Sequence, residues 1–158
     1  MTEIARDVVG RRYYAALYCP GCLAGLPWGG EPFDCIVFLC DPDRARAVAR
    51  TLSADLARSR VDWVQVAGRE AEALHDAIDH ASVAAGRQRA VGDGSPMTSW
   101  HEEAESVGAM AEVSCLGFGF QDHVLVLVVG QDADLQASVE AVRRAAEPVG
   151  APDSGGGK

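Results

Sequence analysis

The amino-acid sequence predicts a single α/β domain built on a small, open, mainly parallel sheet with flanking helices. Two continuous apolar runs, "FDCIVFLC" at 33–40 and "DHVLVLVVG" at 122–130, are typical of strands buried on both faces. A segment with helical spacing follows each run, and strands that alternate with helices pair in parallel through right-handed crossovers. A chain of 158 residues is long enough for one core. We therefore expect one domain over 1–150 and a flexible, Gly-rich tail over 151–158.

The first strand, 33–40, is followed directly by the signals of a helix start. Asp41 is a favourable N-cap residue, and Pro42 suits the first helical position. Apolar residues then recur at helical spacing, namely Ala45, Val48, Leu52 and Leu56. This pattern predicts a helix over about 42–59.

The second strand and helix follow in the same order. "VDWVQVAG" at 61–68 predicts a strand, and its less uniform pattern places it nearer the edge of the sheet. The helix expected over 69–86 ends near Gly86. Its inward face carries Leu74, Ala77, Ile78 and Ala81.

A turn-rich stretch over 87–96 separates these units from the rest of the chain. A third helix is expected from Ser99 to about Gly117, followed by the strand at 122–130 and a helix over 132–146. The expected strand order is 2-1-3. "RRYYAALY" at 11–18 is a candidate for a fourth strand at the edge.

Composition and charge exclude several classes of function. The net charge of −9 argues against nucleic acid or an anionic membrane as the partner, because such binders gather Lys and Arg on one face. The run "VLVLVVG" at 124–130 is far shorter than the ~20 residues of a membrane span. The first 20 residues lack the apolar core of a secretory signal, so we expect a cytoplasmic protein. The remaining partners are a protein or a small molecule, and the oligomeric state is left open.

The segment "MTSWHEE" at 97–103 has two interpretations. Ser99 followed three residues later by Glu102 is a capping box, which predicts the start of a helix, with Trp100 as a packing anchor. Alternatively, the segment is an active-site loop in which His101 acts as a general base, because histidine titrates near neutral pH.

A second group of polar residues lies in "LHDAIDH" at 74–80. His75 with Asp79, and Asp76 with His80, are four residues apart and share one surface of the expected helix. Imidazole and carboxylate groups on one face are suitable metal ligands, and His101 could complete such a site. The alternative is a solvated polar face opposite the buried stripe.

The "YCPGC" segment contains a C-x-x-C unit, formed by Cys19 and Cys22. This spacing is typical of a redox dithiol or of half a zinc site. A thioredoxin-like dithiol opens a long helix, and Pro27, Gly29 and Gly30 argue against such a helix here.

A zinc site would use Cys19, Cys22 and one cysteine of the first strand. Cys35 and Cys40 are five residues apart in that strand and therefore face opposite sides of the sheet. We expect all five cysteines, including Cys115, to be reduced.

The carboxyl ends of parallel strands are the usual place for a ligand in an open sheet. Here these ends read "CDPD" (40–43), "AGRE" (67–70) and "VGQD" (129–132). An acidic rim suited to magnesium is predicted there, made of Asp41, Asp43, Glu70 and Asp132. Asp41 and Asp132 are equally well interpreted as ordinary helix starts. No glycine-rich nucleotide-binding motif is present in the sequence.

The stretch from "VDWVQVAG" through "LHDAIDH" to "PMTSWHEE" resembles an uncharacterised bacterial family, a domain of unknown function whose members share an MT-x-WHE motif. The matching residues are Trp63, Asp76, Asp79, Met97, Thr98, Trp100, His101 and Glu102. The resemblance covers about the middle third of the chain, leaves "YCPGC" outside it and implies no activity. It favours a functional role for Trp100 and His101, beside Thr98 and Glu102.

Two functions from different classes follow. The first is a non-catalytic module that binds a protein or a small molecule at the strand ends and the 87–103 segment, because the sequence contains no complete catalytic set. The second is a metal-assisted hydrolase with His101 as the base and Asp76, Asp79 or His75 nearby. The sequence calls for no cofactor, although zinc or magnesium would fit the ligand types named above.

Overall fold

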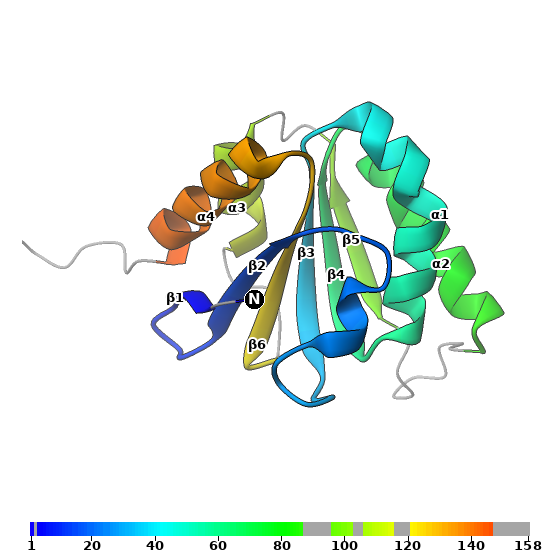
Figure 1. Cartoon of the computed structure of the whole chain (residues 1–158), viewed down its shortest axis with the longest axis horizontal. Coiled ribbons are helices and arrows are strands. Elements are labelled where there is room, and N and C mark those ends of the chain that lie inside the picture. Colours follow the sequence, from blue (N-terminus) through cyan, green and yellow to red (C-terminus); the bar gives the residue numbers. More distant parts are fainter. Residues whose placement is uncertain (2, 87–95, 103–105, 116–120, 147–158) are drawn as a thin grey trace, which may run out of the picture.

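The computed structural model of the chain describes residue 1 and residues 3–86, 96–102, 106–115 and 121–146, with 113–115 described by their backbone alone. These residues form three layers, a sheet between two pairs of helices (Figure 1). The strands are β1 (Glu3–Arg6), β2 (Arg12–Leu17), β3 (Phe33–Leu39), β4 (Val61–Gly68), β5 (Met97–His101) and β6 (His123–Val129). The helices are α1 (Pro42–Arg58), α2 (Ala71–Ala84), α3 (Val107–Cys115) and α4 (Asp132–Ala146), with a short 3-10 helix η1 (Cys22–Gly25).

The six described strands form one sheet in the order β1-β2-β6-β3-β4-β5. β3 pairs in parallel with both β4 and β6, and only β1 is antiparallel to its neighbour. The order 2-1-3 expected from the sequence describes three strands, whereas the sheet contains six. The segment at 11–18 contains β2, which is not an edge strand because β1 pairs along its outer side.

The main correction concerns the helix expected to begin at Ser99, within the segment 97–101. This segment is β5, paired in parallel with the outer side of β4, and the helix begins only at Val107. Ser99 lies opposite Gln65 in this pairing, and its buried hydroxyl has no hydrogen-bond partner among the described residues. The capping-box prediction is therefore wrong. Backbone pairing with β4 outweighs the local helix signal, since strand formation depends strongly on tertiary context.

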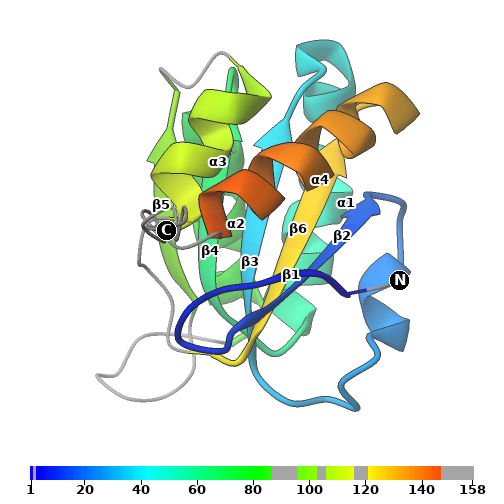
Figure 2. The ribbon, with the colours of Figure 1, turned by 90° about the vertical axis from the view of Figure 1, so that its left-hand side faces the viewer.

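Two apolar cores lie on the two faces of the sheet. Under α1 and α2, the core includes Val37, Leu52, Leu56, Ile78 and Leu125. Under α3 and α4, which Figure 2 shows in front of the sheet, it includes Ile36, Phe38, Met110, Val126 and Val142. Because β3 and β6 are buried along their whole length, their sequences are continuous apolar runs.

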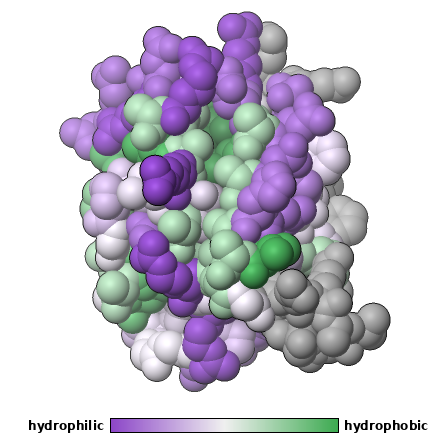
Figure 3. Space-filling view, turned by 90° about the vertical axis from the view of Figure 1, so that its right-hand side faces the viewer, coloured by the Kyte–Doolittle hydropathy of each residue, from purple (hydrophilic) through white to green (hydrophobic). Residues whose placement is uncertain are grey.

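The outer face of α1 and α2 carries hydrophilic side chains with hydrophobic residues between them (Figure 3). Such mixing is usual on protein surfaces. Among the described helices, none is both long enough and apolar enough to cross a membrane.

Candidate functional site

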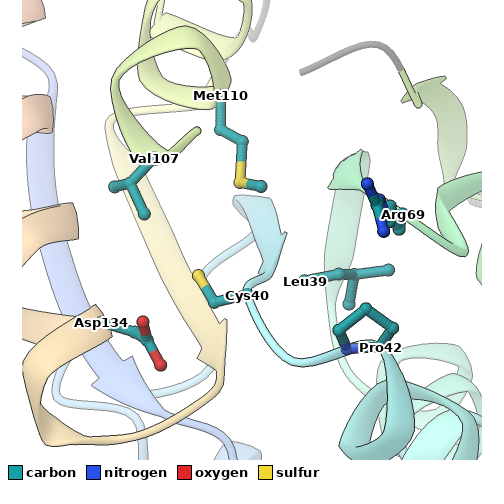
Figure 4. A pocket seen from close by; sticks show the side chains of 7 residues that line it. All are labelled: Leu39, Cys40, Pro42, Arg69, Val107, Met110 and Asp134. Atoms are coloured by element: carbon teal, nitrogen blue, oxygen red, sulfur yellow. The ribbon is translucent and has the colours of Figure 1, made fainter. Parts of the chain in front are cut away.

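A pocket of about 340 Å³ opens at the carboxyl ends of β3 and β4 (Figure 4). The chain leaves β3 toward β4 and β5 through α1 and α2, and then crosses to the other side of β3, where α3 leads into β6. Strand order thus reverses at β3, which is the usual ligand position in an open α/β sheet. The pocket is lined by Leu39, Cys40, Pro42, Arg69, Val107, Met110 and Asp134.

The pocket combines apolar walls with two opposite charges. Leu39 lies between the charged groups, with Met110 extending from α3 above it (Figure 4). Arg69 follows β4 on one side, and Asp134 belongs to the first turn of α4 on the other. Oδ2 of Asp134 accepts a hydrogen bond from the backbone N–H of Gln131 at 2.7 Å. This bond fixes the carboxylate and occupies one of its oxygens.

Cys40 supplies a thiol that stays protonated. Burial, with a smaller contribution from the negative charge of Asp134, raises the pKa of Cys40 to about 11. Because the thiolate is the nucleophilic form, this thiol is not activated at neutral pH. The pocket therefore suits binding better than nucleophilic chemistry at Cys40.

Arg69 lies in the turn between β4 and α2, and the residues on both sides of it have an unusual backbone conformation. Gly68 has φ +110°, and a Cβ added there would lie 2.6 Å from the carbonyl oxygen of Leu39. Glu70 has φ +71°, which is uncommon for a residue other than glycine. Its carboxylate pairs with the guanidinium of Arg46. Left-handed backbone at the rim of a pocket is a feature of many binding sites.

The acidic rim predicted at the strand ends has a different role. Asp41 is the N-cap of α1 and accepts hydrogen bonds from the backbone N–H groups of Asp43 and Arg44, both at 3.0 Å. Asp132 is exposed at the start of α4. Within the described parts of the chain, no group of three or more His, Cys, Asp or Glu side chains could hold a metal ion.

Several of the other predicted residues meet between α2 and β5, in a group that we call the β5–α2 cluster: His75, Asp76, Asp79, Thr98 and Trp100. Nε2 of His75 lies 2.9 Å from Oγ1 of Thr98, and Nδ1 of His75 lies 3.1 Å from Oδ1 of Asp76. The Thr98 hydroxyl also contacts Oδ1 of Asp79 at 2.9 Å. The rings of His75 and Trp100 are 4.4 Å apart, inclined at 50°.

His101 and Glu102 do not join this cluster. Successive side chains of a strand point to opposite faces, so His101 points away from the face on which Thr98 and Trp100 contact α2. Glu102 is exposed in the turn after β5. The histidine beside Asp76 and Asp79 is therefore His75, not His101.

The candidate zinc ligands are also separated. Cys19 and Cys22 follow β2, whereas His75 lies on α2 and contacts β5 at the other end of the strand order. Cys35 packs in the core under α1, and Cys40 packs against the core under α3 and α4. The prediction that these two cysteines face opposite sides is confirmed.

The sequence model of one protein family, described as Domain of unknown function (DUF7684), matches residues 18–145. The chain belongs to this family. The match extends well beyond the middle third of the chain and includes the "YCPGC" segment, which the sequence resemblance left outside. No curated protein sequence matches the chain.

From the sequence, a ligand site was expected at the carboxyl ends of the strands, but the residues that line the pocket were not assigned to it. Leu39 and Met110 resemble ordinary core residues in the sequence, and Asp134 lies in a region rich in acidic residues. The sequence does contain one signal of this site, the glycines at the ends of two strands. Gly68 ends β4 and Gly130 follows β6, and other atoms approach both closely, since a Cβ on Gly130 would lie 2.5 Å from Oδ2 of Asp134.

Proposed function

We propose that the chain is a non-catalytic module that binds a small molecule in the pocket at the carboxyl ends of β3 and β4. The observation that carries this proposal is the cavity of about 340 Å³ at the reversal of strand order, with opposite charges across an apolar floor. A concave, partly apolar site with a few convergent polar groups is the usual form of a ligand pocket. The raised pKa of Cys40 argues against nucleophilic catalysis by that thiol.

The chemical class of the ligand is inferred from the residues that line the pocket. The Arg69 guanidinium suits a carboxylate, because its planar N–H donors match the two carboxylate oxygens. Asp134 suits an ammonium group, and the side chains of Leu39 and Met110 suit an apolar substituent between the charges. Arg69 also interacts with other groups of the chain, but a guanidinium has five N–H donors. We therefore propose a zwitterion of amino-acid size with an aliphatic side chain.

Three probes separate the contributions of the two charges. Leucine carries both charges, 4-methylpentanoate lacks the ammonium group, and 3-methylbutylamine lacks the carboxylate. Binding is followed through the NMR signal of the Met110 methyl group, which lines the pocket. We expect leucine to shift this signal saturably and to bind at least about tenfold more tightly than either single-charge probe, because each lost charge-assisted bond costs about 1.5–3 kcal/mol.

Matched variants test whether the pocket is responsible. Arg69→Gln and Asp134→Asn each remove one charge, and the asparagine retains an oxygen that can accept the bond from Gln131. Arg58→Gln is the control, because this exposed arginine lies in the last turn of α1. We expect both pocket variants to weaken leucine binding about tenfold and the control to leave it unchanged. Equal binding of all three probes, or none at millimolar concentration, would refute the zwitterion class.

Hydrolysis is a second candidate function, favoured by the hydrogen bonds of the β5–α2 cluster. His75 lies between the Thr98 hydroxyl and the Asp76 carboxylate, and it would act as the base once the Thr98 hydroxyl, which here donates to Asp79, turns toward Nε2 of His75. In this second proposal, His75 takes the role of base that was expected for His101. A fluorophosphonate probe that labels Thr98 in the wild type, and fails to label His75→Ala, would support this function. Absence of labelling at Thr98 counts against it.

A further inference from the structure

A tight turn between β2 and η1 brings two cysteines to neighbouring positions. Cys19 and Cys22 are its first and last residues, and the backbone N–H of Cys22 donates to the carbonyl of Cys19 at 3.1 Å. Pro20, followed by Gly21 at φ +80° and ψ 0°, matches the central pair of a type II β-turn. The end Cα atoms of such a turn are less than about 7 Å apart. Disulfides span roughly 4.4–6.8 Å between Cα atoms.

The two cysteines are neighbours across the turn but differ in accessibility. Cys19 is exposed, whereas Cys22 is half-buried. Burial is the main cause that raises the pKa of the Cys22 thiol, and the neighbouring Cys19 side chain raises it further. A reagent in solution therefore reaches Cys19 first, with Cys22 directly behind it.

Asp55 of α1 holds this turn in place. Its Oδ2 accepts a hydrogen bond from the backbone N–H of Gly21 and another from the hydroxyl of Tyr18, both at 2.9 Å. The Asp55 side chain is only 14% exposed. Anchoring on both sides of Cys19 fixes the turn before any bond forms between the cysteines, which lowers the entropic cost of closing the ring.

We propose that Cys19 and Cys22 are a redox-active dithiol that reduces low-molecular-weight disulfides and becomes an intramolecular disulfide. The Cys19 thiolate attacks one sulfur of a disulfide RSSR, so that a mixed disulfide forms and one thiolate RS⁻ leaves. Cys22 loses its proton to water and attacks the sulfur of Cys19, and the second RS⁻ leaves. The two electrons given up by the protein reduce RSSR to two thiols. This site is separate from the pocket, which contains Cys40 and neither of these cysteines.

Equilibration in glutathione buffers of stepped reduced-to-oxidised ratio tests the proposal. The fraction of disulfide is measured as a loss of about 2 Da in intact mass, and peptide mapping identifies the bonded pair. We expect the wild type to convert between dithiol and disulfide within the series, with the bond between Cys19 and Cys22. Cys19→Ser, the matched control, retains the other four cysteines and is expected to form no intramolecular disulfide.

Variants of the Cys19–Cys22 turn test whether the fold favours the disulfide between these two cysteines. Gly21→Ala imposes a left-handed backbone on alanine, although the added Cβ has no atom within 4 Å. Asp55→Asn weakens the anchor. Each is expected to lower the equilibrium constant for ring closure about tenfold, whereas Gly25→Ala, which also adds a Cβ in open space, leaves it unchanged.

Four results would overturn the proposal. The first is a disulfide mapped between Cys22 and Cys35, and the second is no disulfide at the most oxidising glutathione ratio. The third is an equilibrium constant for ring closure in Gly21→Ala and Asp55→Asn that lies within twofold of the wild-type value. The fourth is stoichiometric zinc retained on Cys19 and Cys22 of the purified protein. Circular dichroism establishes that each variant is folded before it is scored.

Discussion

The pocket and the β5–α2 cluster both gather charged and polar side chains, but they use them differently. In the β5–α2 cluster, the polar groups bond to one another, since Thr98 contacts both His75 and Asp79, and His75 also contacts Asp76. In the pocket, the charged groups of Arg69 and Asp134 lie on two sides of a cavity with Leu39 between them.

This difference supports the pocket as the ligand site that we propose. Polar side chains that satisfy one another stabilise the local fold, here the attachment of the edge strand β5 to α2. The charges of Arg69 and Asp134 also interact within the chain, but they line a cavity and can contact a molecule that enters it. The sequence drew attention to the first region through its histidines, whereas the structure favours the second.

The largest expected effect is at Gly68, beside the pocket. Gly68→Ala places a Cβ 2.6 Å from the Leu39 carbonyl and 2.9 Å from Cε of Met110, at φ +110°. We expect the free energy of unfolding to fall by about 3 kcal/mol or more. Gly86→Ala is the control, because φ there is +76° but no atom of the described neighbours lies within 4 Å, and it should cost about 1 kcal/mol. Urea denaturation measures both, and equal losses would show that close packing at Gly68 is unimportant.

Asp41→Ala removes the N-cap of α1, the helix that begins at the pocket residue Pro42. Two backbone N–H groups lose their acceptor, and we expect a loss of about 1 kcal/mol in the free energy of unfolding. Asp43→Ala should cost less than about 0.5 kcal/mol, since Asp43 is an exposed partner of Arg46. If Asp43→Ala costs as much as Asp41→Ala, the stabilisation comes from negative charge near the helix end and not from capping.

Thr98→Val tests the β5–α2 cluster. The change keeps the side-chain shape but removes the hydroxyl that joins His75 and Asp79, so we expect a loss of about 1 kcal/mol in unfolding free energy. Leucine binding should be unchanged, because Thr98 does not line the pocket. A variant that folds but no longer binds leucine would show that the two regions act together.

A further expected effect concerns the dependence of stability on pH. The pKa of Cys40 is raised from 9.0 to about 11 in the folded state, where burial disfavours the thiolate. Its contribution to stability is therefore complete below pH 9 and is lost as the pH rises through 11. Cys40→Ser should lose less stability than the wild type between pH 8 and pH 10, measured by urea denaturation. An identical slope for the two proteins would contradict a raised pKa at Cys40.

The sequence predicted the interior of the fold better than its edges. The apolar runs of β3 and β6 are visible because both faces of these strands are buried. A helix was predicted from Ser99 because Ser99 and Glu102 form the pattern of a capping box. The strand β5 depends instead on pairing with β4, which the local sequence does not encode. The contact between His75 and Thr98 was missed for the same reason.

The site shows a similar limit. The general rule for parallel sheets indicated the correct end of the sheet, but the carboxylates that stood out in the sequence do not line the pocket, and Asp41 caps α1. Arg69 and Asp134 are brought together from the ends of β4 and α4 by the reversal of strand order. Their proximity is a property of the topology.

The most direct test of binding at the pocket is the rate at which iodoacetamide alkylates Cys40 at pH 8.5, with and without leucine. Cys40 lines the pocket, whereas Cys19 is exposed elsewhere on the same chain and serves as an internal control. We predict that saturating leucine slows alkylation of Cys40 at least about tenfold and leaves Cys19 unchanged, while 4-methylpentanoate at the same concentration protects far less. Unchanged alkylation of Cys40 under conditions where leucine binds would place the ligand outside the pocket and contradict this account.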